Sequence, residues 1–279
     1  MSDEKQNNEV FRRVEPKSQL NSLSEAVGFE IPVESITLPS KGKVYSVDHP
    51  LCNQEKIEIK CMTAKEEDLI SSTALINNGT AMSRLMQACL INKLVDPDTL
   101  LIGDRNAILI AIRITGYGPK HKAKVRCRSC GQISENDFSV GGLTITPLGD
   151  TPVQPNTNLF AFTLPISGLD VVFRLLTGKD ELELSQIAER MKKLEMPETP
   201  ITSRLVQSVV SIGETKELEK VAYMVQNLRA GDARALRKHI NKISPGVNMK
   251  QWTKCKNCGE EWEVEMPLGA NFFWPDFDA

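Results

Sequence analysis

Apolar and polar positions follow two different periods along the chain, and together they predict both strands and helices. The run Ile57-Glu-Ile-Lys-Cys alternates apolar and polar residues, as a half-buried strand does. Residues 80–94 instead place their apolar side chains on one helical face, and a shorter helix is predicted over 106–114. Thr63 followed by Glu66 forms a capping box, which predicts a helix that starts there. The pattern therefore indicates an α+β fold.

The same order of segments occurs twice, which predicts an internally duplicated unit of a strand pair, helices and a cysteine-pair ribbon. The matched segments are Thr37-Leu-Pro with Thr163-Leu-Pro, Ile59–Glu67 with Phe173–Glu181, Ser83-Arg-Leu with Ser203-Arg-Leu, Gly103-Asp with Gly231-Asp, and Cys127 with Cys255. Five matches in one order favour a duplication over a chance similarity between amphipathic helices.

These matches divide the chain into five segments. We predict a disordered or loosely docked arm over 1–24, a first α+β repeat over 25–140, a linker over 141–158, a second α+β repeat over 159–266 and a tail over 267–279. Each repeat ends in a CxxC knuckle. The tail contains four aromatic residues that either complete the chain's own core or bind a partner. They are Phe272, Phe273, Trp274 and Phe277.

Composition narrows the class of protein. Hydrophobic residues make up 41% of the 279 residues and the formal net charge is -2, so nothing overall attracts the chain to nucleic acid or to an anionic membrane. No apolar stretch is long enough to span a bilayer, and the polar start lacks the order of a signal peptide. We therefore expect a protein of the reducing cytoplasm without membrane contact.

Four of the seven cysteines form two CxxCG pairs, Cys127/Cys130 and Cys255/Cys258. An odd number of cysteines suits a disulfide framework poorly, and in a reducing compartment such pairs are typical metal ligands. Each pair lies between two strand-like segments, which is the pattern of a zinc ribbon. Since structural zinc takes four thiolates in a tetrahedron, the two pairs predict one structural zinc ion.

Other sites remain open for the same cysteines. A redox pair would need its CxxC at the start of a helix, and an iron–sulfur cluster would also accept four thiolates. Each pair could alternatively bind its own ion with ligands from another chain. A catalytic zinc would need a nearby histidine or carboxylate, but His49, His121 and His239 are scattered without ligand spacing.

Catalytic motifs are missing from the sequence. It contains no nucleophile elbow, Walker loop or dinucleotide-binding glycine pattern. The acidic residues near Glu66 and Asp180 fall in the first turn of a predicted helix, where carboxylates favour the positive end of the helix dipole. We therefore expect no enzyme activity and no small-molecule substrate.

Several motifs together resemble the baseplate hub and hub-assembly protein family of T-even-type contractile-tailed bacteriophages. They are Leu38-Pro-Ser-Lys-Gly-Lys-Val-Tyr, Met62-Thr-Ala-Lys-Glu-Glu-Asp, Leu101-Ile-Gly-Asp-Arg-Asn-Ala-Ile-Leu and Val125-Arg-Cys-Arg-Ser-Cys-Gly. The resemblance implies a structural or assembly role among other baseplate and hub proteins. It also implies a location in the host cytoplasm during assembly, and in the virion if the protein stays in the tail.

A competing hypothesis is a nucleic-acid-binding zinc-ribbon protein. Basic residues flank both cysteine pairs, at Arg126 and Arg128 and at Lys254 and Lys256, and more follow within 229–242. The overall charge balance and the few aromatic residues available for base stacking disfavour this hypothesis.

Overall fold

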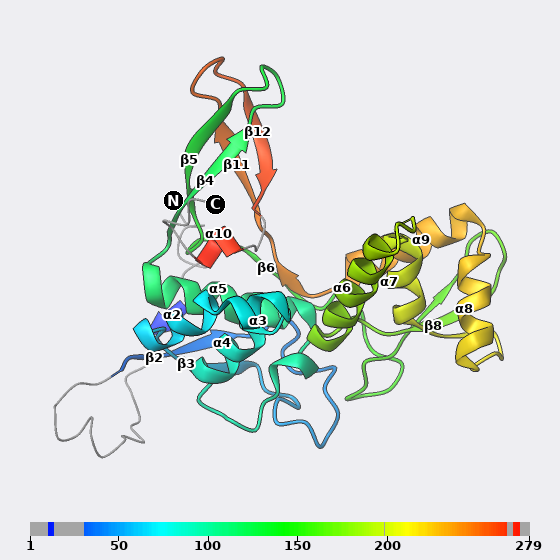
Figure 1. Cartoon of the computed structure of the whole chain (residues 1–279). Coiled ribbons are helices and arrows are strands. Elements are labelled where there is room, and N and C mark those ends of the chain that lie inside the picture. The colour runs from blue at the N-terminus through cyan, green and yellow to red at the C-terminus, as the bar shows by residue number, and fades with distance from the viewer. Residues whose placement is uncertain (1–10, 14–30, 198, 267–269, 274–279) are drawn as a thin grey trace, which may run out of the picture.

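The computed structural model describes residues 11–13, 31–197, 199–266 and 270–273. Figure 1 shows two helix-and-strand units beside one another and a ribbon of paired strands that rises above the first unit. The mixture of helices and antiparallel sheets confirms the α+β prediction. The predicted boundaries of the arm, repeats, linker and tail stay predictions.

The first unit packs helices on a small antiparallel sheet. The sheet has the order β1-β2-β3, so residues 11–13 of the predicted arm pair with β2. The helices run from the capping box at Thr63 to the end of the long α5. The elements are β1 (Phe11–Arg13), β2 (Val33–Thr37), β3 (Lys56–Lys60), α2 (Ala64–Ser71), α3 (Thr73–Asn77), α4 (Ala81–Cys89), the 3-10 turn η2 (Pro97–Thr99) and α5 (Ile102–Tyr117).

Two helices of this unit differ from their predicted lengths. The helix predicted over 80–94 ends at Cys89, because Leu90 leaves it to form an antiparallel bridge with Ile59 of β3. The helix predicted over 106–114 is longer, because α5 continues through Gly103 and Gly116. Both glycines lie against other parts of the chain, so close packing rather than a helix end accounts for them.

The second unit has a similar order of elements. Its sheet has the order β7-β8-β9, and its first helix again starts at a capping box, here Thr177 with Asp180. The elements are β7 (Phe160–Thr163), β8 (Asp170–Phe173), α6 (Gly178–Lys193), α7 (Pro200–Ser208), β9 (Val209–Ile212), α8 (Leu218–Gln226) and α9 (Ala230–Ile243).

Backbone contacts join the two units. The amide of Ile102 donates to the carbonyl oxygen of Leu176 (3.1 Å), and the amide of Gly178 donates to that of Leu100 (3.0 Å). Two short strands, β6 (Ile145–Thr146) and β10 (Gly246–Val247), pair close by. Buried apolar residues of both units belong to one continuous core, so the units fold against each other.

Two hairpins form the ribbon, β4 (Lys120–Arg126) with β5 (Ile133–Ser139) and β11 (Lys250–Lys254) with β12 (Glu261–Glu265). In each hairpin an exposed basic strand faces an exposed acidic strand, as in the pairs Lys124 with Glu135 and Lys254 with Glu261. The amide of Ser139 donates to Oε1 of Gln251 (3.2 Å), which links the hairpins.

The start of the predicted aromatic tail is part of the chain's own core. Helix α10 (Ala270–Phe273) lies between the foot of the ribbon and α5 (Figure 1). Phe272 and Phe273 are each 1% exposed, and Nε of Arg113 donates to the carbonyl oxygen of Phe272 (3.0 Å). This burial gives these two residues an internal role. Trp274 and Phe277 lie outside the described residues, and the partner-binding role of the tail stays a prediction.

Candidate metal centre

Each knuckle lies at the tip of a hairpin and is closed by two backbone hydrogen bonds of the same kind. In the first, the amide of Cys127 donates to the carbonyl oxygen of Gln132 (2.9 Å), and the amide of Gly131 donates to that of Cys127 (3.0 Å). Gly131 has a φ of 70°, a conformation that side chains other than glycine rarely adopt. This glycine therefore lets the chain turn back directly after Cys130.

The second knuckle repeats this geometry. The amide of Cys255 donates to the carbonyl oxygen of Glu260 (2.8 Å), the amide of Gly259 donates to that of Cys255 (3.0 Å), and Gly259 has a φ of 75°. The two CxxCG motifs thus fold alike, as their shared sequence predicts.

The two knuckles face each other and bring four sulfur atoms together. Sγ of Cys127 lies 3.7 Å from Sγ of Cys258, and Sγ of Cys130 lies 3.7 Å from Sγ of Cys255. All four ligand atoms lie within 4.8 Å of one another. Zinc–sulfur bonds of about 2.3 Å in a tetrahedron place the sulfurs roughly 3.8 Å apart, so this arrangement fits a four-thiolate zinc site.

Neighbouring groups stabilise negative charge on these sulfurs. The amide of Ser129 points to Sγ of Cys127 and the amide of Asn257 points to Sγ of Cys255, both at 3.4 Å. Hydrogen bonds from the Gln132 backbone and the Asn257 side chain lower the pKa of Cys130 to about 6. Backbone amides therefore favour thiolates at both knuckles.

The fourth thiol, Cys258, has a raised pKa. The Glu260 backbone would lower the pKa of Cys258, but burial and hydrogen bonding to the other thiols raise it to about 11. Four thiols this close cannot all ionise alone, because like charges repel. A divalent cation at their centre would remove this penalty and permit four thiolates.

Packing and ion pairs hold the knuckles together from outside. Cys127 and Cys255 are 1% and 2% exposed and pack against Trp262. Across the site, Arg128 forms a salt bridge with Glu260 (Nη2 to Oε1, 3.1 Å). A basic residue of the first knuckle thus contacts an acidic residue of the second.

Among the described residues, these four cysteines are the one group of three or more His, Cys, Asp or Glu side chains placed to hold a metal. The three histidines lie elsewhere. His49 hydrogen-bonds Thr99, His121 contacts Phe272 and His239 stacks on Phe162.

Comparison with protein families decides the class of the protein. The family described as T4 bacteriophage base plate protein matches residues 31–274 of the chain, which include both units and both knuckles. The chain belongs to this T4 bacteriophage base plate protein family. Searches of curated proteins and of solved structures each found no match. The baseplate part of the resemblance is therefore confirmed.

In this baseplate protein, the motif Leu101-Ile-Gly-Asp-Arg-Asn is a structural joint, a role that its sequence did not reveal. Asp104 is 0% exposed and accepts hydrogen bonds from Ser40 and Tyr45 of the preceding loop. Nη1 of Arg105 forms a salt bridge with Oδ1 of Asp98 (3.0 Å) and its guanidinium packs against Gly178 of the second unit. The motif thus links the loop, the helix α5 and the second unit.

Proposed function

We propose that this protein is a hub component or hub-assembly factor of a contractile phage tail baseplate, stabilised by one structural zinc ion. The observation that carries the proposal is the family match over residues 31–274. Its partners would be other baseplate and hub proteins. It would act in the host cytoplasm during assembly and stay in the virion if it is a tail component. Within the described ranges, no helix has the length and apolar run needed to cross a bilayer.

Zinc would give the ribbon stability that its small core does not supply. The buried cluster at the knuckles consists of Cys127, Cys255 and Trp262, with Val125 and Val264 beside it. Since so few apolar side chains are buried there, a metal that binds folded thiolates would contribute directly to the folding free energy. Because each unit leads into one knuckle, the ion would also hold the ends of both units together.

A structural role without catalysis agrees with the use of the acidic residues. Glu66 and Asp180 both cap a helix and form salt bridges, with Lys60 and Arg174 respectively. These carboxylates are therefore occupied by structural contacts. We propose that the protein is not an enzyme and takes no small-molecule substrate.

We also propose that the two units arose by internal duplication. Three matched contacts support this. In each unit, an amide of the turn after Thr-Leu-Pro donates to a buried aspartate, Asp104 or Asp232. Each capping-box acid forms a salt bridge with a cation at the end of the preceding strand. The residue that follows α4 or α7 pairs with β3 or β8, respectively. In this last match Leu90 pairs with Ile59, and Val209 pairs with Phe173, the residue that corresponds to Ile59 in the sequence match.

The nucleic-acid alternative has less support. The basic strand β4 runs beside acidic β5, and Lys122 and Lys124 lie directly opposite Asp137 and Glu135. Because Lys122 and Lys124 each have a carboxylate as cross-strand neighbour, the middle of this hairpin lacks the uninterrupted positive face that binds phosphates.

Metal analysis tests the zinc proposal. We expect about one zinc per chain by elemental analysis of purified protein, and loss of this zinc in both Cys127→Ser and Cys255→Ser. Cys89→Ser, a buried cysteine far from the knuckles in sequence, is the matched control and should keep its zinc. Zinc that is only halved by each variant would indicate two half-sites, and zinc-free wild-type protein would contradict the proposal.

Particle assembly tests the baseplate role separately. In a phage that carries Cys127→Ser, we expect fewer complete baseplates, counted by electron microscopy of lysates, than with Cys89→Ser. Mass spectrometry of purified particles distinguishes a hub component, which stays in the tail, from an assembly factor, which is absent. Normal numbers of complete tails from a phage that cannot make this protein would contradict a baseplate role.

A further inference from the structure

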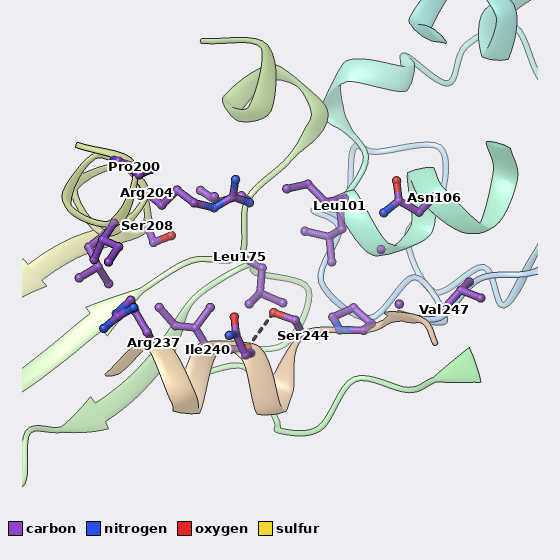
Figure 2. A pocket seen from close by; sticks show the side chains of 18 residues that line it. Leu101, Asn106, Leu175, Pro200, Arg204, Ser208, Arg237, Ile240, Ser244 and Val247 are labelled. Atoms are coloured by element: carbon purple, nitrogen blue, oxygen red, sulfur yellow. Dashed lines mark hydrogen bonds between the residues drawn. The ribbon is translucent and has the colours of Figure 1, made fainter. Parts of the chain in front are cut away.

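A groove lies where the two units meet (Figure 2). Leu101 and Asn106 at the start of α5 form one wall, and α7 with Arg204 and α9 with Arg237 form the other. The cavity volume is about 490 Å³. Figure 2 shows Arg204 reaching from α7 toward Leu101, above a floor that includes Leu175 and Ile240. The groove thus combines an apolar floor with one cationic wall.

Both arginines lack an acidic partner. The residues that line the groove include Arg204 and Arg237 but no aspartate, glutamate or lysine. In the described part of the chain, neither arginine takes part in a salt bridge. Nε of Arg237 donates a hydrogen bond to the carbonyl oxygen of Ala233 (3.4 Å). Two unpaired guanidiniums over apolar side chains favour a ligand with carboxylates between apolar groups.

The shape of this surface suits an extended peptide. A second hollow of about 250 Å³ lies on the other side of α7 and shares Pro200 and Arg204 with the groove. Ile187 and Ile201, beside these hollows, are 41% and 50% exposed. A mostly apolar track, with Glu181 of the second hollow as its one acidic lining residue, therefore runs across α7 with Arg204 at its middle, a length better matched to a polypeptide than to a compact ligand.

We propose that this groove binds the segment 274–279, Trp-Pro-Asp-Phe-Asp-Ala, of a second copy of the chain. Asp276 and Asp278 would pair with the two arginines, and Trp274 and Phe277 would cover the apolar floor. Of the longer segments outside the described residues, this one carries acidic residues without a basic one, since 1–10 contains Lys5 and 14–30 contains Lys17. Its charge and apolar content complement the groove.

Geometry favours a second copy over the same chain. Phe272 is held beside Arg113 of α5 by a hydrogen bond. Arg113 lies seven residues along this helix from Asn106 in the groove wall, a distance of about 10 Å at 1.5 Å per residue. Six extended residues reach about 20 Å at most. In its own chain the segment would use about half its length before it reached the near wall. Asp276, four residues past Phe272, reaches about 14 Å at most and would end close to that wall, so only Asp278 could approach α7 and α9. A contact between tail and groove of different copies avoids this limit and is head-to-tail.

Sedimentation velocity at increasing concentration tests this contact. We expect the full-length chain to associate, and expect the groove variant Arg204→Glu/Arg237→Glu and the tail variant Asp276→Lys/Asp278→Lys each to associate at least about tenfold more weakly. An equal mixture of the two variants restores one native tail and one native groove. The reversed tail and the reversed groove also carry opposite charges, so the mixture should associate more strongly than either variant alone.

Arg84→Glu is the matched control. Arg84 is an exposed arginine of α4 at the position that corresponds to Arg204 in the sequence match, and it does not line the groove. This variant should associate like wild type. A chain that stays monomeric at every concentration would overturn the proposal, as would association that both charge reversals leave unchanged. Because the contact involves neither the cysteines nor other phage proteins, its failure would leave the zinc and baseplate proposals standing.

Discussion

Both α+β units tie a turn to their last helix through a buried aspartate, but the first unit ties it more tightly. Asp104 accepts a hydrogen bond from the amide of Ser40 (2.8 Å), another from its hydroxyl, and a third from the hydroxyl of Tyr45 (2.6 Å). Burial raises the pKa of Asp104, and burial together with this carboxyl group raises that of Tyr45. The aspartate is thus the centre of a buried polar network.

The second unit keeps the anchor without the network. Asp232 accepts hydrogen bonds from the amides of Ile166 (2.8 Å) and Ser167 (3.1 Å), and the side chain of Ile166 is 53% exposed. Where the first unit has Arg105 after its aspartate, the second has Ala233. The turn that both units share therefore needs only backbone amides as donors. In the first unit, Tyr45 and Arg105 add side-chain contacts, and the second unit packs against this joint.

The largest expected difference between the units comes from removing these carboxylates. Asp104→Ala leaves three buried donors without an acceptor, and we expect a loss of roughly 4 kcal/mol in the free energy of unfolding. Asp232→Ala leaves two amides near the surface, where water can replace the carboxylate, and we expect a loss of about 1 kcal/mol. Urea unfolding monitored by circular dichroism measures both. Equal losses would contradict the stated asymmetry.

A second comparison uses the glycine before each aspartate. A Cβ on Gly103 would overlap the carbonyl oxygen of Pro245, so Gly103→Ala must push the two backbones apart. We expect a loss of about 3 kcal/mol.

The matching change in the second unit is milder. A Cβ on Gly231 would overlap only Cδ1 of Ile166, the far end of a flexible side chain. Alanine is also favoured over glycine inside a helix by about 1 kcal/mol. We therefore expect Gly231→Ala to change the unfolding free energy by less than about 1 kcal/mol. A Gly103→Ala protein with the wild-type urea midpoint would show that this contact does not hold the units together.

The same joint shows what the sequence can and cannot predict. The cysteine knuckles were predictable because their geometry is local, since ligand spacing and the glycine after each pair determine the turn at Cys127 and Cys255. The helix ends were not. Leu90 leaves its helix to pair with Ile59, and α5 runs through Gly103 because Pro245 packs there. Such contacts join residues that are far apart in sequence, so periodicity carries no sign of them.

The groove was unpredictable for a related reason. Its walls come from the start of α5 and from α7 and α9, more than ninety positions further on (Pro200 follows Asn106 by 200 − 106 = 94). Arg237 lies in a basic stretch that suggests a solvated helix face, and only the docking of the units places it opposite Asn106. The sequence match between Ser83-Arg84 and Ser203-Arg204 gave no sign that the second arginine faces a groove and the first does not.

A third comparison concerns the capping-box acids and is sensitive to pH. Burial would raise the pKa of Asp180, but hydrogen bonds from Arg174, Thr177 and Gln207 hold it well below the ordinary range. Burial of Glu66 is likewise outweighed by Lys60 and Thr63, and its pKa is lowered. Both pairs therefore stabilise the fold fully above the unfolded pKa of about 4, and this stability is lost as the pH falls below that value through the lowered pKa of each carboxyl group, which is lower for Asp180 than for Glu66.

The basic partner of each acid determines how much the pair contributes to the free energy of unfolding. Arg174 makes two hydrogen bonds of 2.6 Å to Asp180, and Lys60 makes one of 2.7 Å to Glu66. We expect Arg174→Met to cost about 2 kcal/mol at pH 7 and Lys60→Met about 1 kcal/mol. Urea unfolding from pH 7 down to about pH 3 should show both differences from wild type shrinking with acid. Differences of the same size at every pH would point to lost packing instead of lost charge.

The smallest expected effect on stability concerns His121, at the start of the ribbon strand that follows the first unit. His121 of β4 corresponds to Met249 in the cysteine match, and it packs on Phe272 with Nδ1 buried and without a hydrogen-bond partner among the described residues. Burial, and then the nearby Arg113, lower the pKa of His121. Because its folded pKa lies below the unfolded value of about 6.5, neutral His121 favours the fold above that pH, and this stability is lost as the pH falls below it. His121→Met should change stability by less than about 1 kcal/mol at pH 7.5 and should flatten the decline between about pH 6.5 and 5. An unchanged slope would mean that His121 is not the acid-sensitive contact of α10.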